Sequence, residues 1–129
     1  MRRKRGFTLI ELMVVIVILG ILAGIAWVNY AGRADDARWE QARTDMTEVH
    51  KALSLWSINN HNEWPESLES VSDLFSGRKV PVDPFRKEPY RYEKTPQGYR
   101  MVCLGKDGAE GGEGISRDIV FDESGCVQP

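Results

Sequence analysis

The chain has 129 residues, of which 42% are hydrophobic and 28% are charged, and this length predicts one small domain. Its 17 Lys and Arg residues face 19 Asp and Glu residues, a formal net charge of −2. Residues 2–5 are all basic; without them 13 basic residues face 19 acidic ones, a formal charge of −6. Nothing in this acidic remainder resembles a basic nucleic-acid-binding patch, so no nucleic acid is expected as a partner.

An apolar run follows the basic cluster. No charged side chain occurs from Leu12 to Val28, and counted from Phe7 the run reaches the roughly 20 residues that a helix needs to cross a membrane. The basic residues predict that the N-terminal end stays in the cytoplasm and that the acidic remainder lies across the membrane. Glu11 is unusual in this run, because an unpaired charge inside a bilayer costs at least about 2.5 kcal/mol.

A cleaved secretory signal and a plain uncleaved anchor are two interpretations of this run. A secretory signal needs a small-residue cleavage site, and Ala23 and Ala26 offer candidates. No obvious mature start follows them, because a helical pattern continues through residues 27–46. A plain anchor accounts for the run but gives no reason for Gly6, Phe7 and Glu11.

The stretch KRGFTLIELMVV resembles the class III signal of type IV pilins and type II secretion pseudopilins. The resemblance implies that residues 1–6 are a leader, that a prepilin peptidase cuts between Gly6 and Phe7, and that Phe7 is then N-methylated. It also implies that Glu11 meets the positive amine of Phe7 on a neighbouring subunit during assembly. Residues 7–30 would then be the membrane-spanning, filament-core part of a helix, and residues 31–129 a periplasmic head.

A hydrophobic stripe continues beyond the apolar run, at alternating spacings of three and four that mark one face of a helix. Its members are Trp39, Ala42, Met46, Val49, Leu53 and Trp56. No proline occurs from Phe7 to Trp64, so the sequence predicts one helix of about 50 residues that ends near residues 59–62. The stripe is expected to pack against the head; a separate coiled coil is the alternative.

The C-terminal half predicts short elements. Residues 66–75 are expected to form a short helix or turn after Pro65, and Pro81, Pro84 and Pro89 mark an extended link. Strands are expected at 90–93, 99–103 and 119–121. The predicted fold class is α+β, a type IV pilin-like fold with a long N-terminal helix packed on a small antiparallel sheet.

Two further stretches sharpen the resemblance. VPVDPFRKEPYRYE resembles the D-P-W-G-x-P-Y-x-Y stretch of the major, G-type pseudopilin family of type II secretion, and CLGKDGAEGGEGISRDI resembles that family's S-L-G-A-D-G-x-x-G-G-x-G-x-x-A-D-I loop. The chain departs from the pattern in three places. Phe85-Arg86-Lys87 replaces Trp-Gly-Asn, Cys103 stands where serine is usual, and Arg117 replaces alanine.

The second stretch predicts a Ca²⁺ loop. Calcium takes six to eight oxygen ligands in flexible geometry, and Asp107 and Asp118 place carboxylates at both ends of a glycine-rich segment. The resemblance implies Asp107 and Asp118 as side-chain ligands and Leu104 as a carbonyl ligand. Ser116 stands where many relatives have an acid, and Glu110 and Glu113 are further candidate donors. The alternative is a flexible acidic loop without metal.

Cys103 and Cys126 are the only cysteines and both fall in the exported part, where one disulfide is the simplest interpretation. The bond would close about 24 residues and stabilise by about 3–4 kcal/mol. A cysteine pair is usual in type IV pilins, whereas G-type pseudopilins generally rely on calcium alone. The cysteines therefore favour the alternative, a type IV pilin of a surface fibre.

No catalytic set with supporting spacing is present, and His50 and His61 are interpreted as surface residues, so the chain is not expected to be an enzyme. The resemblance implies a structural subunit that polymerises into a periplasmic filament and drives protein export. Implied partners are copies of itself, minor pseudopilins, the prepilin peptidase, an inner-membrane assembly platform and inner-membrane lipid. A membrane-anchored binding module that does not polymerise is a further alternative, and it would lack cleavage at Gly6.

Overall fold

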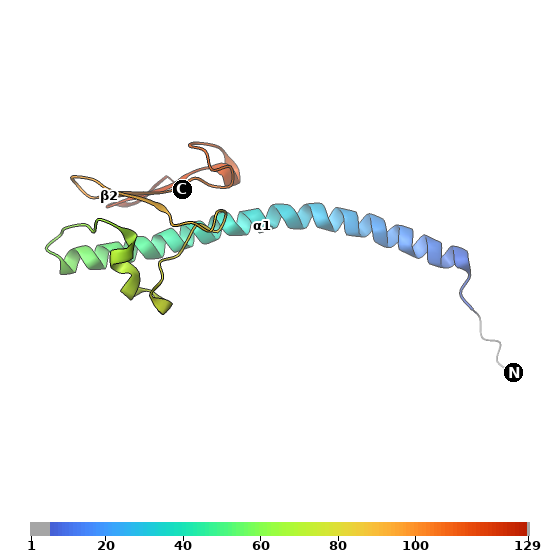
Figure 1. Ribbon diagram of the computed structural model, residues 1–129. Helices are drawn as coiled ribbons and strands as arrows, with labels where there is room; N and C mark the ends of the chain where they lie inside the picture. The colour runs from blue at the N-terminus through green and yellow to red at the C-terminus, as the bar shows by residue number, and fades with distance from the viewer. Residues whose placement is uncertain (1–5, 129) are drawn as a thin grey trace. The chain divides into compact units, whose positions relative to one another are not determined.

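The computed structural model describes residues 6–128, so the basic cluster at positions 2–5 lies outside the described residues. The elements follow in the order α1 (Leu9–Asn59), η1 (Leu68–Leu74), η2 (Ser76–Arg78), β1 (Arg91–Lys94), β2 (Tyr99–Cys103), η3 (Gly114–Ser116), β3 (Ile119–Asp122) and β4 (Gly125–Gln128), with η marking 3-10 helices (Figure 1). This is the predicted α+β arrangement of one long helix followed by a small antiparallel sheet.

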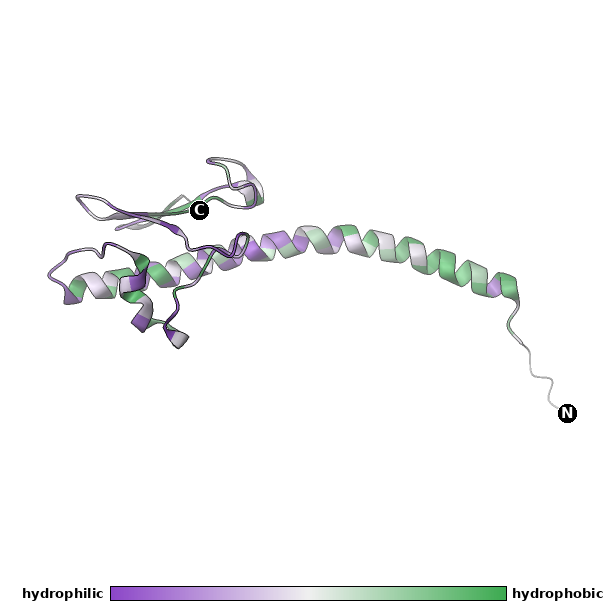
Figure 2. Cartoon of the chain, viewed as in Figure 1, coloured by the Kyte–Doolittle hydropathy of each residue, from purple (hydrophilic) through white to green (hydrophobic). Residues whose placement is uncertain are grey.

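The chain divides between Ala34 and Asp35 into two compact units, and α1 contributes to both. In the first unit the apolar side chains of α1 are exposed. Figure 2 shows this part of the helix mainly in the green of hydrophobic residues. This helix is long and apolar enough to cross a membrane. Its 51 residues confirm the predicted length, and its end at Asn59 lies in the predicted range.

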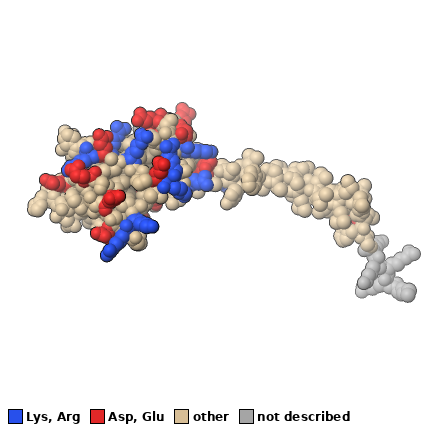
Figure 3. Space-filling model, in the orientation of Figure 1, with Lys and Arg blue, Asp and Glu red and all other residues tan. Residues whose placement is uncertain are grey.

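The second unit has its own hydrophobic core. Buried residues of α1 include Trp39, Met46, Val49 and Leu53, at the predicted three-and-four spacing, whereas Trp56 is only partly buried. They pack in one cluster with side chains from η1 and from one face of the sheet, which confirms that the stripe packs a head. Charged side chains gather on the surface of this unit in Figure 3.

The sheet is a meander with the order β1-β2-β3-β4, and every pair of neighbours is antiparallel. In β2, Tyr99, Met101 and Cys103 alternate with more exposed residues, and Ile119 and Phe121 do the same in β3. The period of two places these side chains on the face that joins the core. β4 was not predicted; it adds an edge strand after a tight turn at residues 122–125.

An aromatic group extends the core at the end of α1. Tyr99 is 1% exposed, and its ring lies 4.9 Å from the ring of Trp64 and 5.6 Å from that of Tyr92. The Tyr92 hydroxyl donates to the Pro65 carbonyl (2.7 Å), which fastens the segment after α1 to β1. The predicted short helix at 66–75 is observed as the 3-10 helix η1.

Candidate functional site

The N-terminal segment presents the expected processing site in an open form. Gly6 and Phe7 precede α1 and are exposed, with 82% of Phe7 accessible. A peptidase needs an extended, accessible peptide, and this segment is not helical at the Gly6–Phe7 bond. The geometry is therefore compatible with cleavage there.

Glu11 caps the start of α1, a role that was not predicted from the sequence. The Thr8 N–H donates to Glu11 Oε2 (2.8 Å), and the Glu11 N–H donates to Thr8 Oγ1 (3.4 Å). This reciprocal pair is a capping box, T-x-x-E, which satisfies donors that the first turn of a helix leaves free. The spacing of Thr8 and Glu11 was the signal that would have found it. The second Glu11 oxygen makes no hydrogen bond in the part of the chain that the structure describes.

The glycine-rich loop runs from Leu104 to Asp118 and connects β2 to β3. Because Cys103 pairs with Ile119, the two ends of the loop begin side by side. The loop closes on itself through the Lys106 N–H, which donates to the Ile115 carbonyl (3.0 Å). Gly105 has a φ of +66°, and a Cβ there would collide with the backbone of residues 115–116. Glycine is therefore required at this crossing.

Asp118 is the most informative residue of the loop. It is 8% exposed, and its Oδ2 accepts the Gly111 N–H (2.9 Å). Its Oδ1 is buried and has no hydrogen-bond partner among residues 6–128. A buried carboxylate oxygen without a partner is costly, because its desolvation is not compensated. This oxygen therefore has the chemistry expected of a cation ligand.

The other expected ligands differ in their surroundings. Asp107 is exposed and its Oδ1 accepts the Ala109 N–H (3.2 Å), whereas Ser116 is half-buried in η3. No group of three or more His, Cys, Asp or Glu side chains suited to a metal occurs within residues 6–128. A metal here would need carbonyl and hydroxyl oxygens besides the carboxylates. Calcium accepts such a mixed set, whereas zinc prefers nitrogen and sulfur ligands.

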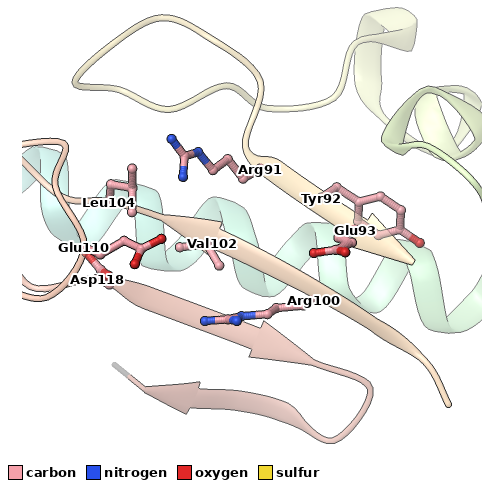
Figure 4. A pocket seen from close by; sticks show the side chains of 8 residues that line it. All are labelled: Arg91, Tyr92, Glu93, Arg100, Val102, Leu104, Glu110 and Asp118. Carbon is pink, nitrogen blue, oxygen red and sulfur yellow. The ribbon is translucent and has the colours of Figure 1, made fainter. Parts of the chain in front are cut away.

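An open cavity of about 490 Å³ lies beside the loop. Leu104, Glu110 and Asp118 line it from the loop, and Arg91 and Arg100 line it from β1 and β2 (Figure 4). Figure 4 shows the Glu110 carboxylate turned toward Val102, although Glu110 is exposed. The cavity is lined by both positive and negative side chains, so its surface is polar. Its lining residues offer no nucleophile–base pair for catalysis.

The structure does not form the expected disulfide, because both cysteines are free thiols. Cys103 lies on β2 opposite Ile119, and Cys126 lies on β4 opposite Phe121. Strands β2 and β4 both pair with β3, so they lie about 10 Å apart, two strand spacings. A disulfide needs Cα atoms within about 6.8 Å. The meander therefore keeps the two residues beyond bonding distance.

Each thiol has a different environment. Cys103 is buried, and its Sγ donates to Asp83 Oδ2 at 3.6 Å. Burial is the largest cause that raises the pKa of the Cys103 thiol to about 12, so this group is a thiol and a hydrogen-bond donor at neutral pH. Cys126 is exposed on the edge strand.

The interpretation of His50 as a surface residue is wrong. Its ring is half-buried, Nδ1 lies 2.5 Å from the Tyr99 hydroxyl, and the Phe121 ring lies 6.0 Å away. Burial lowers the pKa of His50, and the negative charge of Asp122 opposes this shift. Lys51 and Glu48 next to it in the sequence are exposed, and this misled the prediction. His61 is exposed, as predicted.

Two family models together match most of this chain. Residues 1–27 match the family model described as "Prokaryotic N-terminal methylation motif", and residues 29–122 match "Type II secretion system (T2SS), protein G". The chain is similar to the Type II secretion system core protein G of Pseudomonas aeruginosa, at 34% identity over 92% of this chain and 94% of the relative. The protein of that name from Vibrio cholerae is 32% identical over 92% of each chain. That from Escherichia coli is 34% identical over 83% of this chain and 77% of its own.

Proposed function

Because the chain belongs to the type II secretion system protein G family, we propose that it is the structural subunit of a secretion pseudopilus, a filament that drives protein export. The observation that carries the proposal is the match over residues 29–122, directly after a methylation motif at 1–27. Type IV pilins share the N-terminal motif, but the protein G match favours secretion over a surface fibre.

The proposed cycle begins in the inner membrane, with the N-terminus cytoplasmic and the head periplasmic. The prepilin peptidase cuts after Gly6, and the amine of Phe7 becomes the new N-terminus and is methylated. The exposed position of both residues before α1 supports this step. The exposure of apolar side chains on every side of residues 9–28 suits lipid first and neighbouring copies later, because neither environment requires a polar face.

Glu11 is proposed to pair with the amine of Phe7 on the next subunit. In the structure one of its oxygens caps α1 and the other is free of hydrogen bonds within the described chain, so capping and pairing can occur together. A carboxylate in an apolar filament core is costly unless it is paired, and removing one partner of a buried pair typically costs about 3–5 kcal/mol. Assembly in register is thereby favoured over slipped packing.

The head is proposed to bind Ca²⁺ through Asp107, Asp118, the Leu104 carbonyl and Ser116. The unpartnered Oδ1 of Asp118 supports this proposal. A bound calcium ion would supply the positive charge that this oxygen lacks and would hold the loop closed between β2 and β3. The chain's own contribution is the crossing at Gly105, which brings the two ends of the loop together.

The remaining partners follow from this role. Copies of the chain, minor pseudopilins and an inner-membrane assembly platform are the proposed protein partners, and inner-membrane lipid surrounds the stored subunit. A role as a building block requires no catalytic residue in the head. It requires instead one apolar segment for the filament core and one stable head for its surface.

The test is Glu11→Ala in cells that carry the complete secretion system, with Glu40→Ala on the exposed face of α1 as the control. We expect the Glu11 variant to be cut after Gly6, as mass spectrometry of the N-terminus would show, but to remain in the membrane fraction without filaments. Normal filaments and normal secretion from this variant would contradict the proposed pairing. An uncut N-terminus in the wild type would instead indicate a membrane-anchored module, and fibres on the cell surface a type IV pilin.

A further inference from the structure

The turn formed by residues 83–88, here called the Asp83 turn, is fixed by its own hydrogen bonds. The Asp83 N–H donates to the Glu88 carbonyl (2.9 Å), and the Lys87 N–H donates to the Asp83 carbonyl (2.8 Å). The Asp83 carboxylate also accepts the Phe85 N–H at 2.8 Å. Three bonds within six residues leave the backbone at Arg86 little freedom.

The Asp83 turn is also anchored to the sheet. Asp83 is 5% exposed, and its Oδ2 accepts the hydrogen bond from the Cys103 thiol at the end of β2. A Val82–Pro89 bridge closes the turn at its base. Because Leu104 follows Cys103 directly, this anchor lies immediately before the first residue of the glycine-rich loop. Asp83 and Leu104 line one small cavity together with Arg86.

Arg86 extends from this fixed turn onto the loop. Its guanidinium fills the space where a Cβ of residue 108 would stand, so it lies directly against the backbone of Gly108. Gly108 has a φ of +65°, a conformation that glycine adopts without strain. The family pattern has glycine at position 86, so this contact belongs to this chain rather than to the resemblance.

The charge of the loop favours the same contact. Residues 104–118 carry the acids Asp107, Glu110, Glu113 and Asp118 against two basic residues, Lys106 and Arg117. This excess of acidic residues makes the loop negative overall, so the loop attracts a cation placed against it. Arg86 supplies a positive charge that is covalently tied to the neighbouring turn and is present whether or not a metal ion is bound.

We infer that Arg86 is a positioning residue that holds the glycine-rich loop closed in the absence of a metal ion. The inference deepens the proposed calcium role, on which it rests only for the identity of the loop. With Arg86 in place, the loop keeps its conformation between encounters with calcium. Without it, the closed loop depends on the metal and on the loop's own hydrogen bonds.

Hydrogen–deuterium exchange of the full-length protein in detergent micelles tests this inference. Amides of residues 104–118 are followed in excess EDTA and in millimolar CaCl₂ for the wild type, Arg86→Ala and Arg86→Lys. Lys87→Ala is the matched control, since it removes the same charge from the same turn at an exposed neighbouring residue. Exchange in α1 and in β2 and β3 reports whether a variant has lost global stability.

In EDTA we expect the loop amides of Arg86→Ala to exchange at least about fivefold faster than those of the wild type, because the Arg86 side chain no longer opposes local opening of the loop. Lys87→Ala should exchange like the wild type, and Arg86→Lys should lie between, because it keeps the charge but not the planar group. Equal loop exchange in the wild type and Arg86→Ala in EDTA would overturn the inference. So would faster exchange of the same size in Lys87→Ala.

The response to CaCl₂ tests the proposed calcium role separately. If calcium binds the loop, its addition slows exchange at 104–118 in the wild type and restores protection in Arg86→Ala. If calcium changes neither protein, the calcium proposal fails while the EDTA comparison still decides the role of Arg86. The two failures are therefore distinguishable within one experiment.

Discussion

Asp118→Asn gives the sharpest test of the calcium loop, because its effect should change sign with the metal. Asparagine has nearly the shape of aspartate, and its amide oxygen can still accept the Gly111 N–H that Asp118 Oδ2 accepts at 2.9 Å. The substitution removes the charge on the buried Oδ1, which has no partner within residues 6–128. The substitution keeps the shape of the side chain and puts a neutral NH2 group in the place of the charged oxygen.

The expected magnitudes follow from that geometry. An unpartnered buried polar atom costs about 1–3 kcal/mol, and more when it is charged, so in EDTA the variant should be at least as stable as the wild type. Calcium at about 100 times its Kd should add about 2.7 kcal/mol to the free energy of unfolding of the wild type. For a head of this size that is a rise in Tm of about 10–20 °C. The variant should gain little.

Thermal unfolding of the full-length protein in detergent, followed by tryptophan fluorescence with and without calcium, measures both effects. Glu48→Gln is the control, since Glu48 is exposed on α1 and lies outside the loop. A variant that gains as much from calcium as the wild type would show that Asp118 is not a ligand. A variant that is clearly less stable than the wild type in EDTA would show that the charge on the buried oxygen does not destabilise the metal-free protein.

Three more outcomes are expected. Burial lowers the pKa of His50 below its usual value of about 6.5. The stability that the neutral ring contributes is therefore complete above pH 6.5 and is lost as the pH falls through the lowered pKa. Tm of the wild type should fall from pH 7.5 to 5, and His50→Gln should flatten that slope. In buffer without reductant a maleimide should label Cys126 in the native protein and Cys103 only after unfolding, whereas no labelling before reduction would indicate a disulfide. Met46→Ala should cost about 2–5 kcal/mol in denaturant unfolding, because Met46 is fully buried, while the exposed Leu55 should tolerate alanine with little loss.

Long-range periodicity made the helix and its buried face predictable. Two signals extend over many residues: no proline occurs from Phe7 to Trp64, and the apolar stripe repeats from Trp39 to Leu53. Each further repeat makes a helix a clearer choice over a strand or a loop. The first three strands were predicted within about one residue, since turn residues bound each of them. β4 was missed because only Cys126 and Val127 of its four residues are apolar, too short a run for an alternating pattern. The Ser124-Gly125 turn before it was the available signal.

The site was less predictable, because it depends on contacts between segments far apart in the sequence. The cysteine pair suggested a bond that the strand order does not permit, and a sequence does not state which strands lie between two residues. His50 was assigned to the surface from its charged neighbours, although its partner Tyr99 is 49 positions away. The hydrogen bond between Asp83 and Cys103 was not predicted for the same reason, because it joins residues 20 positions apart. The calcium ligands remain predictions, supported by the unpartnered oxygen of Asp118.

The order of the sheet has a consequence for how the protein matures. Each strand pairs with the one before it, so the whole sheet is built from local hairpins in the last 40 or so residues and closes few long loops. The helical face that it covers, from Trp39 to Leu53, is synthesised well before it. In the proposed export of the head across the membrane, that face has no cover until β2 and β3 arrive. We expect newly made subunits to be most prone to wrong contacts in that interval, and completed heads to be protected from them.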